Sequence, residues 1–133
     1  MPNLTITNND LGGVVLKGGQ FRDELITFAG ADTFVAGTIL ARDSGTLKLV
    51  KFVKGGVTAG NGIPKAILTY DVVATAAGDV PSRVAVSGEF VKSRLVIDLD
   101  GNDTNVDAAV IDQLREYGLT PVTVTDLSKL DNQ

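Results

Sequence analysis

The acidic segment Asp98-Leu-Asp-Gly-Asn-Asp103 comes nearest to a metal site by residue type and spacing. Carboxylates at alternating positions, here Asp98, Asp100 and Asp103, can converge on a hard cation such as Ca²⁺. The pattern departs from an EF-hand loop, because Gly101 stands at loop position four instead of six and Ala109 occupies position twelve in place of Glu. We therefore predict no metal site but a solvated turn, with acids placed favourably near a helix N-terminus.

Nucleophilic catalysis needs a hydroxyl or thiol beside a base, and this chain contains no His and no Cys. Two adjacent Ser–Lys pairs remain, Lys92 with Ser93 and Ser128 with Lys129. Neighbours along a strand point to opposite faces, so the first pair is not expected to act together. Glu89 and Asp98 are carboxylates of the kind a glycosidase uses, but any acidic protein offers such pairs. We predict a protein that is not an enzyme and binds no cofactor.

The composition is that of one globular domain with an aliphatic core. A chain of 133 residues with 44% hydrophobic residues can bury a core, which must rest on Val, Ile, Leu and Ala because Trp is absent. The net charge is −4 and the cations are scattered, which argues against nucleic-acid binding. No apolar run approaches the ~20 residues that span a bilayer, and the start of the chain lacks a signal-peptide pattern. We expect no nucleic acid or membrane partner, and synthesis in a cytoplasm.

Turn signals divide the chain into three parts. Residues 1–33 are expected to form an extended N-terminal arm or peripheral segment, in which 21–28 fits either a strand or a helical turn. Residues 34–125 are expected to form a β-rich domain, followed by a polar tail over 126–133 that frays. Several short strands between turns are typical of a small barrel or sandwich. The predicted fold class is therefore mainly β (α+β), with one C-terminal amphipathic helix.

Apolar runs and turn residues give an expected order of strands in the β-rich domain. Residues 34–41 are nearly all apolar, as in a strand buried on both faces, and 43–45 form a turn. Further strands are expected over 47–52 and 66–70. Residues 83–97 hold either two strands or one long bent strand, with Gly88 as a possible bulge.

The helix is expected over residues 104–117. Asp103 and Thr104 are both plausible N-caps, since their side chains can accept from free backbone N–H groups. Its apolar stripe recurs at helical spacing and consists of Val106, Val110, Leu114 and Tyr117. Gly118 suits a left-handed C′ position, and a short strand is expected over 121–125.

The order of five segments resembles the head decoration (capsid cementing) protein family of tailed bacteriophages, which is lambda decoration protein-like. These segments are 36–42, 47–52, 60–72, 84–90 and 111–122. The resemblance implies a β-rich structural protein of the virion that binds the outer surface of the expanded capsid. It further implies a homotrimer that contacts the major capsid protein and stabilises the shell against the pressure of packaged DNA.

In that family the N-terminal segment orders against the major capsid protein, often by adding a strand. The candidate capsid-binding arm of this chain is Leu4, Thr5, Ile6 and Thr7, whose apolar and polar residues alternate. Pairing of this segment within its own domain remains an equal alternative. Two other functions stay open: a β-rich carbohydrate- or ligand-binding surface module, and a hydrolase built on carboxylates.

Overall fold

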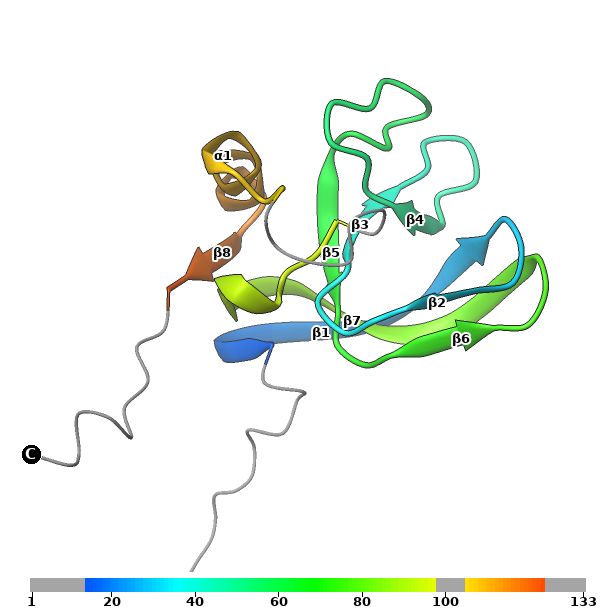
Figure 1. The fold of residues 1–133 in the computed structure, drawn as a ribbon, viewed down its shortest axis with the longest axis horizontal. Helices are drawn as coiled ribbons and strands as arrows, with labels where there is room; N and C mark the ends of the chain where they lie inside the picture. Colours follow the sequence, from blue (N-terminus) through cyan, green and yellow to red (C-terminus); the bar gives the residue numbers. More distant parts are fainter. Residues whose placement is uncertain (1–13, 98–104, 124–133) are drawn as a thin grey trace, which may run out of the picture.

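The computed structural model describes residues 14–97 and 105–123, and five of its strands close into a small barrel (Figure 1). Around the barrel the order is β1-β4-β3-β5-β7, and β1 pairs back to β7. These strands are β1 (Val15–Phe28), β3 (Ile39–Arg42), β4 (Leu49–Lys51), β5 (Pro64–Leu68) and β7 (Gly78–Val91). The mainly β fold class with a small barrel is confirmed.

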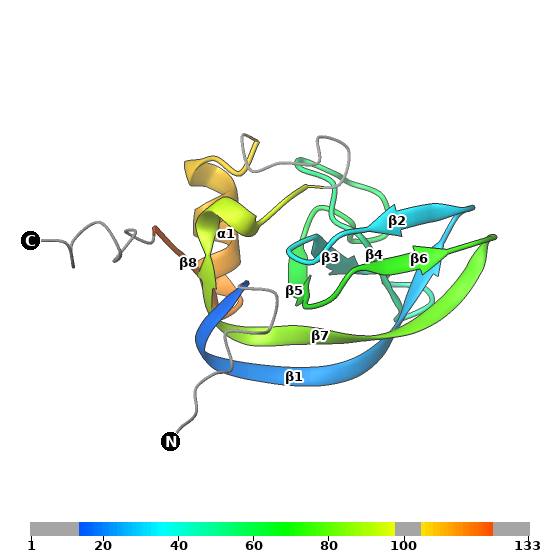
Figure 2. The same ribbon diagram turned by 60° about the horizontal axis from the view of Figure 1, so that its bottom comes forward.

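The remaining elements lie at the two ends of the barrel. Strand β8 (Leu119–Val122) pairs in parallel with the end of β7, and helix α1 (Ala108–Glu116) precedes it. Strands β2 (Asp32–Phe34) and β6 (Val72–Ala74) form a separate two-stranded sheet. Figure 2 shows this sheet at the end of the barrel away from α1 and β8. A short 3₁₀ helix, η2 (Lys92–Arg94), follows β7.

All five barrel strands contribute side chains to an inner core. Its buried members are Ile26, Phe28, Phe34, Leu40, Leu49, Ala66, Leu68, Ala74 and Val84. The rings of Phe28 and Phe34 lie 4.4 Å apart between centroids and close the core toward β2. This aliphatic interior follows from the composition, which offers no Trp and few aromatic residues.

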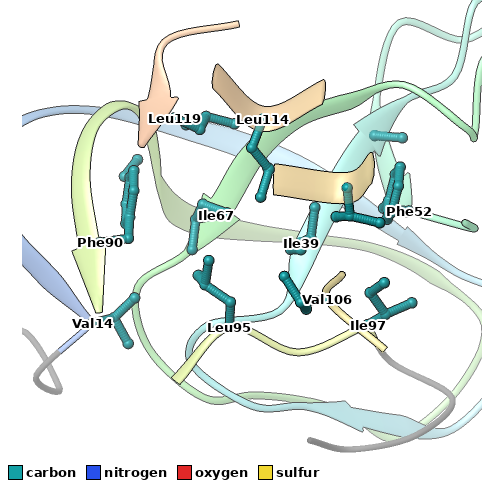
Figure 3. Close-up of a cluster of buried hydrophobic side chains, with 13 residues drawn as sticks. Val14, Ile39, Phe52, Ile67, Phe90, Leu95, Ile97, Val106, Leu114 and Leu119 are labelled. Atoms are coloured by element: carbon teal, nitrogen blue, oxygen red, sulfur yellow. The ribbon is translucent and has the colours of Figure 1, made fainter. Parts of the chain in front are cut away.

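An outer core lies on the opposite face of β3 and β5, under α1 and β8 (Figure 3). Successive strand residues point to opposite faces, so Leu40 enters the inner core while Ile39 and Ala41 enter the outer one. The same alternation places Ile67 in the outer core beside Leu114 of α1. Both faces of β3 are therefore buried, which confirms the prediction made from its apolar run.

Strand β1 is longer and more central than the sequence indicated. The first 33 residues were expected to lie outside the β-rich body, whereas β1 spans Val15–Phe28 and closes the barrel. Only its last residues are buried, so its sequence shows a weak period of two. Two residues of β1, Gly18 and Gly19, lie opposite Gly88 of β7 where the register shifts, so the bulge lies in β1.

Helix α1 begins later than the sequence predicted. It starts at Ala108, and the N-cap is Asp107, whose carboxylate accepts from the backbone N–H of Val110 at 3.1 Å. The expected caps, Asp103 and Thr104, lie outside the described residues. At the other end Gly118 has φ +81, the left-handed conformation expected there.

Residues 83–97 were expected to form two strands or one long bent strand, but only residues 83–91 are in a strand. Strand β7 begins earlier, at Gly78, and ends at Val91, where η2 takes over. Val96 then forms an isolated parallel bridge with Thr38. In the described part of the chain, no helix is long and apolar enough to cross a bilayer.

Pro121 lies in β8 opposite Phe90. The N–H of Gly88 donates to the carbonyl of Gly118 at 3.0 Å, so the backbone groups of Gly118 point toward β7. Because backbone groups alternate along a strand, those of Thr120 also point toward β7 and those of Pro121 point away from it. Proline has no backbone N–H, and this position faces the edge of β8 that pairs with no strand among the described residues, so no ladder bond is lost there. A strand added to this edge would lack one donor, so β8 is a poor template for pairing.

Candidate functional site

The candidate arm Leu4–Thr7 and most of the acidic segment fall outside the described residues. The described chain starts at Val14, which is fully buried in the outer core and accepts a hydrogen bond from the N–H of Val91 at 2.8 Å. Val14 therefore lies in the core that also contains Leu114 of α1 and Leu119 of β8 (Figure 3). Asp98, Asp100 and Asp103 also fall outside; within residues 14–97 and 105–123, no cluster of three potential ligands could hold a metal ion.

The candidate catalytic residues that are described do not assemble into a site. Lys92 and Ser93 are neighbours in η2, not in a strand as predicted. Consecutive residues of a 3₁₀ helix point about 120° apart, so their adjacency in sequence still does not make a nucleophile–base pair. Glu89 lies on β7 opposite Lys17, whereas its proposed partner Asp98 and the pair Ser128–Lys129 lie outside the described residues.

A surface that sequence reasoning did not identify is built by two loops next to β4, and the second of them contacts α1 through the hydrogen bond from the Gln113 side chain to the carbonyl of Gly62. We call residues 43–48 and 53–63 the loop platform; in Figure 1 both loops stand above the barrel next to β4. In the first loop the carboxylate of Asp43 accepts from the backbone N–H groups of Gly45 at 2.7 Å and Thr46 at 3.0 Å. These bonds lower the pKa of Asp43, the bond from Thr46 most, and confirm the predicted turn.

Backbone hydrogen bonds tie the second loop to itself and to the first. The N–H of Ser44 donates to the carbonyl of Ala59 at 2.9 Å, which joins the two loops. The N–H of Val53 donates to the carbonyl of Asn61 at 2.8 Å, and the Asn61 side chain accepts from the N–H of Thr58 at 3.2 Å. These hydrogen bonds hold both loops of the loop platform in a defined conformation.

Two residues of the loop platform, Leu47 and Ala59, hold left-handed backbone conformations without being glycine. Their φ angles are +64 and +48. Such a conformation costs a non-glycine residue about 1–2 kcal/mol, and it persists only where the surroundings enforce it. The side chain of Leu47 is 65% exposed, so it gains little from burial in the monomer. The sequence had placed Leu47 in a strand, but β4 begins only at Leu49.

The loop platform exposes aliphatic side chains. Val57 is 94% exposed, and Val53 and Ile63 are each exposed by more than a third. Beside them lies a hollow of about 360 Å³ between the β1–β2 turn, β4 and the β4–β5 loop. Its lining includes the buried rings of Phe28 and Phe34, Val50, and small residues such as Gly30 and Ala59.

Each of the four cations between positions 42 and 63 is paired with a carboxylate, whereas the carboxylate of Asp43 is held by backbone N–H groups. Arg42 pairs with Glu24, Lys48 with Asp79, Lys51 with Asp32, and Lys54 with Asp107. The hydrogen bonds from Lys48 and Lys54 lower the pKa of Asp79 and of Asp107, so both carboxylates stay ionised at neutral pH. The platform therefore presents apolar side chains beside paired cations and the carboxylate of Asp43.

The ion pair of Arg42 and Glu24 anchors the first loop to β1, and we predict that it makes stability pH-dependent. Both guanidinium NH groups donate to the carboxylate at 2.9 Å, and one also donates to the carbonyl of Leu47 at 2.8 Å. The hydrogen bond from Arg42 holds the pKa of Glu24 below its ordinary value of 4.5. Because the pKa of Glu24 is lower in the folded protein than its ordinary value of 4.5, the ion pair adds to the free energy of unfolding above pH 4.5. This contribution is lost as the pH falls through the pKa of Glu24 in the folded protein.

Urea unfolding of Glu24→Gln should show a free energy of unfolding lower by about 1 kcal/mol at pH 7. The difference from the wild type should shrink below pH 4.5, because the wild-type carboxylate is then protonated. Asp23→Asn is the matched control, since the Asp23–Arg83 pair is largely exposed and contributes little. A difference that is the same at pH 7 and pH 3 would contradict this prediction.

Comparison with known protein families gives a match over most of the chain. The family model described as bacteriophage lambda head decoration protein D matches residues 4–119. The matched range begins at Leu4 and ends at the start of β8, so it contains the candidate arm, the barrel and α1. No curated protein matches the chain.

Proposed function

Since the chain belongs to the bacteriophage lambda head decoration protein D family, and is thus a structural protein associated with the phage capsid, we propose that it binds the outer surface of the expanded capsid. There it stabilises the shell against the internal pressure of packaged DNA, without catalysis. Its partner is the major capsid protein, and it acts as a homotrimer made in the host cytoplasm. The observation that carries this proposal is the family match over residues 4–119.

We propose that the arm Leu4–Thr7 binds the capsid shell. The family match begins at Leu4, which supports a role for this segment in the family's shared architecture. An alternating segment of this kind can add to the edge of a capsid strand through backbone hydrogen bonds, with Leu4 and Ile6 in apolar contact. The free edge of β8 is a poor internal template because of Pro121, which favours a partner outside the chain. Three arms on one trimer would bind with a high effective concentration.

The alternative of a carbohydrate-binding module has the hollow beside the loop platform as its only structural support among the described residues. Sugar-binding surfaces commonly offer an exposed aromatic face, whereas Phe28 and Phe34 at the hollow are 3% and 1% exposed. We therefore prefer the capsid role.

Cosedimentation with purified shells tests the proposed function. We expect saturable binding of the full chain to expanded, undecorated capsids and little binding to unexpanded shells. Decorated capsids should also release their DNA at a higher temperature than undecorated ones. Absence of binding to either kind of shell, at protein concentrations up to the micromolar range, would overturn the proposal.

A further inference from the structure

Among the described residues, one carboxylate in the hollow beside the loop platform has no cationic partner. Asp43 lines this hollow, and its Oδ1 atom accepts two backbone hydrogen bonds, from Gly45 at 2.7 Å and from Thr46 at 3.0 Å. Within residues 14–97 and 105–123, no group donates to its Oδ2 atom. An ionised carboxylate has about four acceptor sites, so Asp43 keeps unused capacity for a donor.

The cations around Asp43 are already engaged. Those that flank it in the first loop form the ion pairs described above. Lys51, the cation on the described lining of the hollow, pairs with Asp32, the other carboxylate there. The described lining therefore carries one negative charge in excess, that of Asp43. The backbone hydrogen bonds from Thr46 and Gly45 lower the pKa of Asp43, so this charge persists at neutral pH.

Most of the remaining lining is apolar. Val50, Val53 and Ala59 contribute aliphatic surface next to the buried rings of Phe28 and Phe34. The volume of about 360 Å³ is near the lower end of the ~300–1,000 Å³ that is usual for ligand pockets. The hollow is therefore large enough for one long side chain and too small for a folded element such as a helix.

The combination of one excess carboxylate with an apolar lining narrows the chemistry of the occupant. An anion would be repelled by Asp43, and a wholly apolar group would bury that carboxylate without a partner. A metal ion is unsuited, because the described residues offer no cluster of three potential ligands. A cation on an apolar stem satisfies both parts of the hollow, and the side chains of lysine and arginine are of this kind.

We propose that the hollow binds a lysine or arginine side chain of the major capsid protein. The cationic group donates to Oδ2 of Asp43, and the aliphatic stem packs against Val50 and Val53. This inference rests on the proposed function and adds to it a second contact with the shell, separate from the arm.

The position of the hollow and the expected strength of one ion pair favour the shell as the source of this side chain. The hollow lies at the β1–β2 turn, whereas Val14 precedes the other end of β1 (Figure 2). A partner that contacts both ends of this strand is held at two separate points. A free cation would bind an open hollow weakly, because association costs translational and rotational entropy. A side chain of a partner that is already bound avoids most of this cost. Another copy of this chain is disfavoured by the net charge of −4 on each copy.

Two substitutions test the charge and the space of the hollow. In Asp43→Asn the amide oxygen can still accept from Gly45 and Thr46, so the turn is kept while the negative charge is lost. Gly30→Leu occupies part of the hollow, and a Cβ at Gly30 meets no heavy atom within 4 Å. Asp112→Asn is the matched control, because it removes one negative charge at an exposed position of α1 that does not line the hollow.

Cosedimentation of the full-length protein with expanded, undecorated capsids measures the contact. We expect Asp43→Asn and Gly30→Leu to lower the apparent affinity by about 3- to 10-fold, and Asp112→Asn to change it by less than about 2-fold. Raising the NaCl concentration from about 50 to about 500 mM should narrow the difference between the wild type and Asp43→Asn, because salt screens the ion pair. Hollow variants that bind as tightly as Asp112→Asn would overturn the inference.

A titration without shells tests the hollow directly. The probe is Nα-acetyl-arginine methylamide, whose only charge is the guanidinium group, and the readout is the amide NMR spectrum of the full-length protein. We expect saturable shifts of the N–H signals of Gly45, Thr46 and Ala59, with a dissociation constant in the millimolar range. The shifts should be much smaller in Asp43→Asn, and also with the uncharged probe Nα-acetyl-norleucine methylamide. Equal shifts with both probes, or none at these residues, would contradict the proposed site.

These experiments separate the inference from the proposed function. A wild type that binds no shell removes the proposed function and the capsid protein as the source of the side chain, whereas the titration still decides whether the hollow binds a cation. Sedimentation equilibrium without shells tests a neighbouring copy as the occupant. If Asp43→Asn and Gly30→Leu alter the mass of the protein in solution and Asp112→Asn does not, a second copy fills the hollow and the inference is wrong.

Discussion

Deletion of residues 1–13 is expected to lower the apparent affinity for expanded capsids by about 100-fold or more, while the barrel stays folded. If each of three arms adds a strand to the shell, losing all of them removes both the contacts and the gain from multivalency. The cut falls just before Val14, which is 1% exposed and accepts a hydrogen bond from Val91. Cosedimentation measures the loss, and circular dichroism with thermal unfolding shows that the fold persists.

The position of this cut matters for the interpretation. A chain that started at Gly18 would also lack Val14 and Val15, which belong to the outer core or pack against it. Its failure to bind would then mix loss of the arm with loss of structure. The deletion of residues 1–13 avoids this, because it ends where the described barrel begins.

Side-chain substitutions in the arm provide the matched control. In an added strand Leu4 and Ile6 share one face, and Thr5 and Thr7 share the other. The double change Leu4→Asp with Ile6→Asp should weaken binding strongly, whereas Thr5→Asp with Thr7→Asp should weaken it less. A deletion that binds as tightly as the full chain would show that the grip lies elsewhere on the protein.

The sequence was informative where burial leaves a local pattern. Ile39–Ala41 is apolar without interruption because alternate residues enter two different cores, and the strand was predicted on that ground. The stripe of α1 was also correct for Val106, Val110 and Leu114, which are all buried. Tyr117, the last stripe residue, is 40% exposed with Lys65 over its ring, because α1 ends at Glu116 and Tyr117 is the C-cap with a non-helical backbone.

The sequence was less informative where pairing with distant residues decides the structure. Residues 15–23 are largely exposed and are interrupted by Gly18 and Gly19, so neither helical nor strand periodicity stands out. They form a strand because β7 pairs with them along its length, a contact between segments some 60 residues apart. Local propensity could not supply that information.

The loop platform shows a similar limit for the candidate site. Leu47 alternates with Leu49 and was therefore assigned to a strand, yet its N–H donates to the carbonyl of Asp43 in a tight turn. The available signal was Val57, an aliphatic residue isolated among loop glycines. The arm at Leu4–Thr7 remains a prediction, because it lies outside the described residues.

Gly37→Ala is expected to destabilise the protein by at least about 3 kcal/mol, a large part of the 5–15 kcal/mol that holds a domain folded. Gly37 has φ +97, which alone costs a residue with a Cβ about 1–2 kcal/mol. In addition, a Cβ at this position would lie 1.9 Å from the backbone carbonyl oxygen of Arg94. That oxygen belongs to the main chain, so no side-chain rotation can relieve the clash, and overpacking adds about 1–3 kcal/mol more.

The clash would displace Gly37, which is hydrogen-bonded both to β5 and to the segment after η2. Gly37 donates to the carbonyl of Leu68 at 2.8 Å and accepts from the N–H of Val96 at 3.0 Å, so it links β5 to the segment after η2. Moving Gly37 away from Arg94 would lengthen these bonds and disturb Leu95, which is fully buried in the outer core. The damage therefore extends beyond one residue.

Gly55→Ala isolates the contribution of the clash. Gly55 also has a left-handed φ, +73, but a Cβ there meets no heavy atom within 4 Å. It should lose only the conformational term of about 1–2 kcal/mol in urea unfolding. If Gly37→Ala and Gly55→Ala lowered the free energy of unfolding equally, the backbone near Arg94 must move aside at little cost. The strained φ alone would then explain both losses. A much larger loss for Gly37→Ala would instead show that this close backbone contact holds the segment after η2 against the barrel.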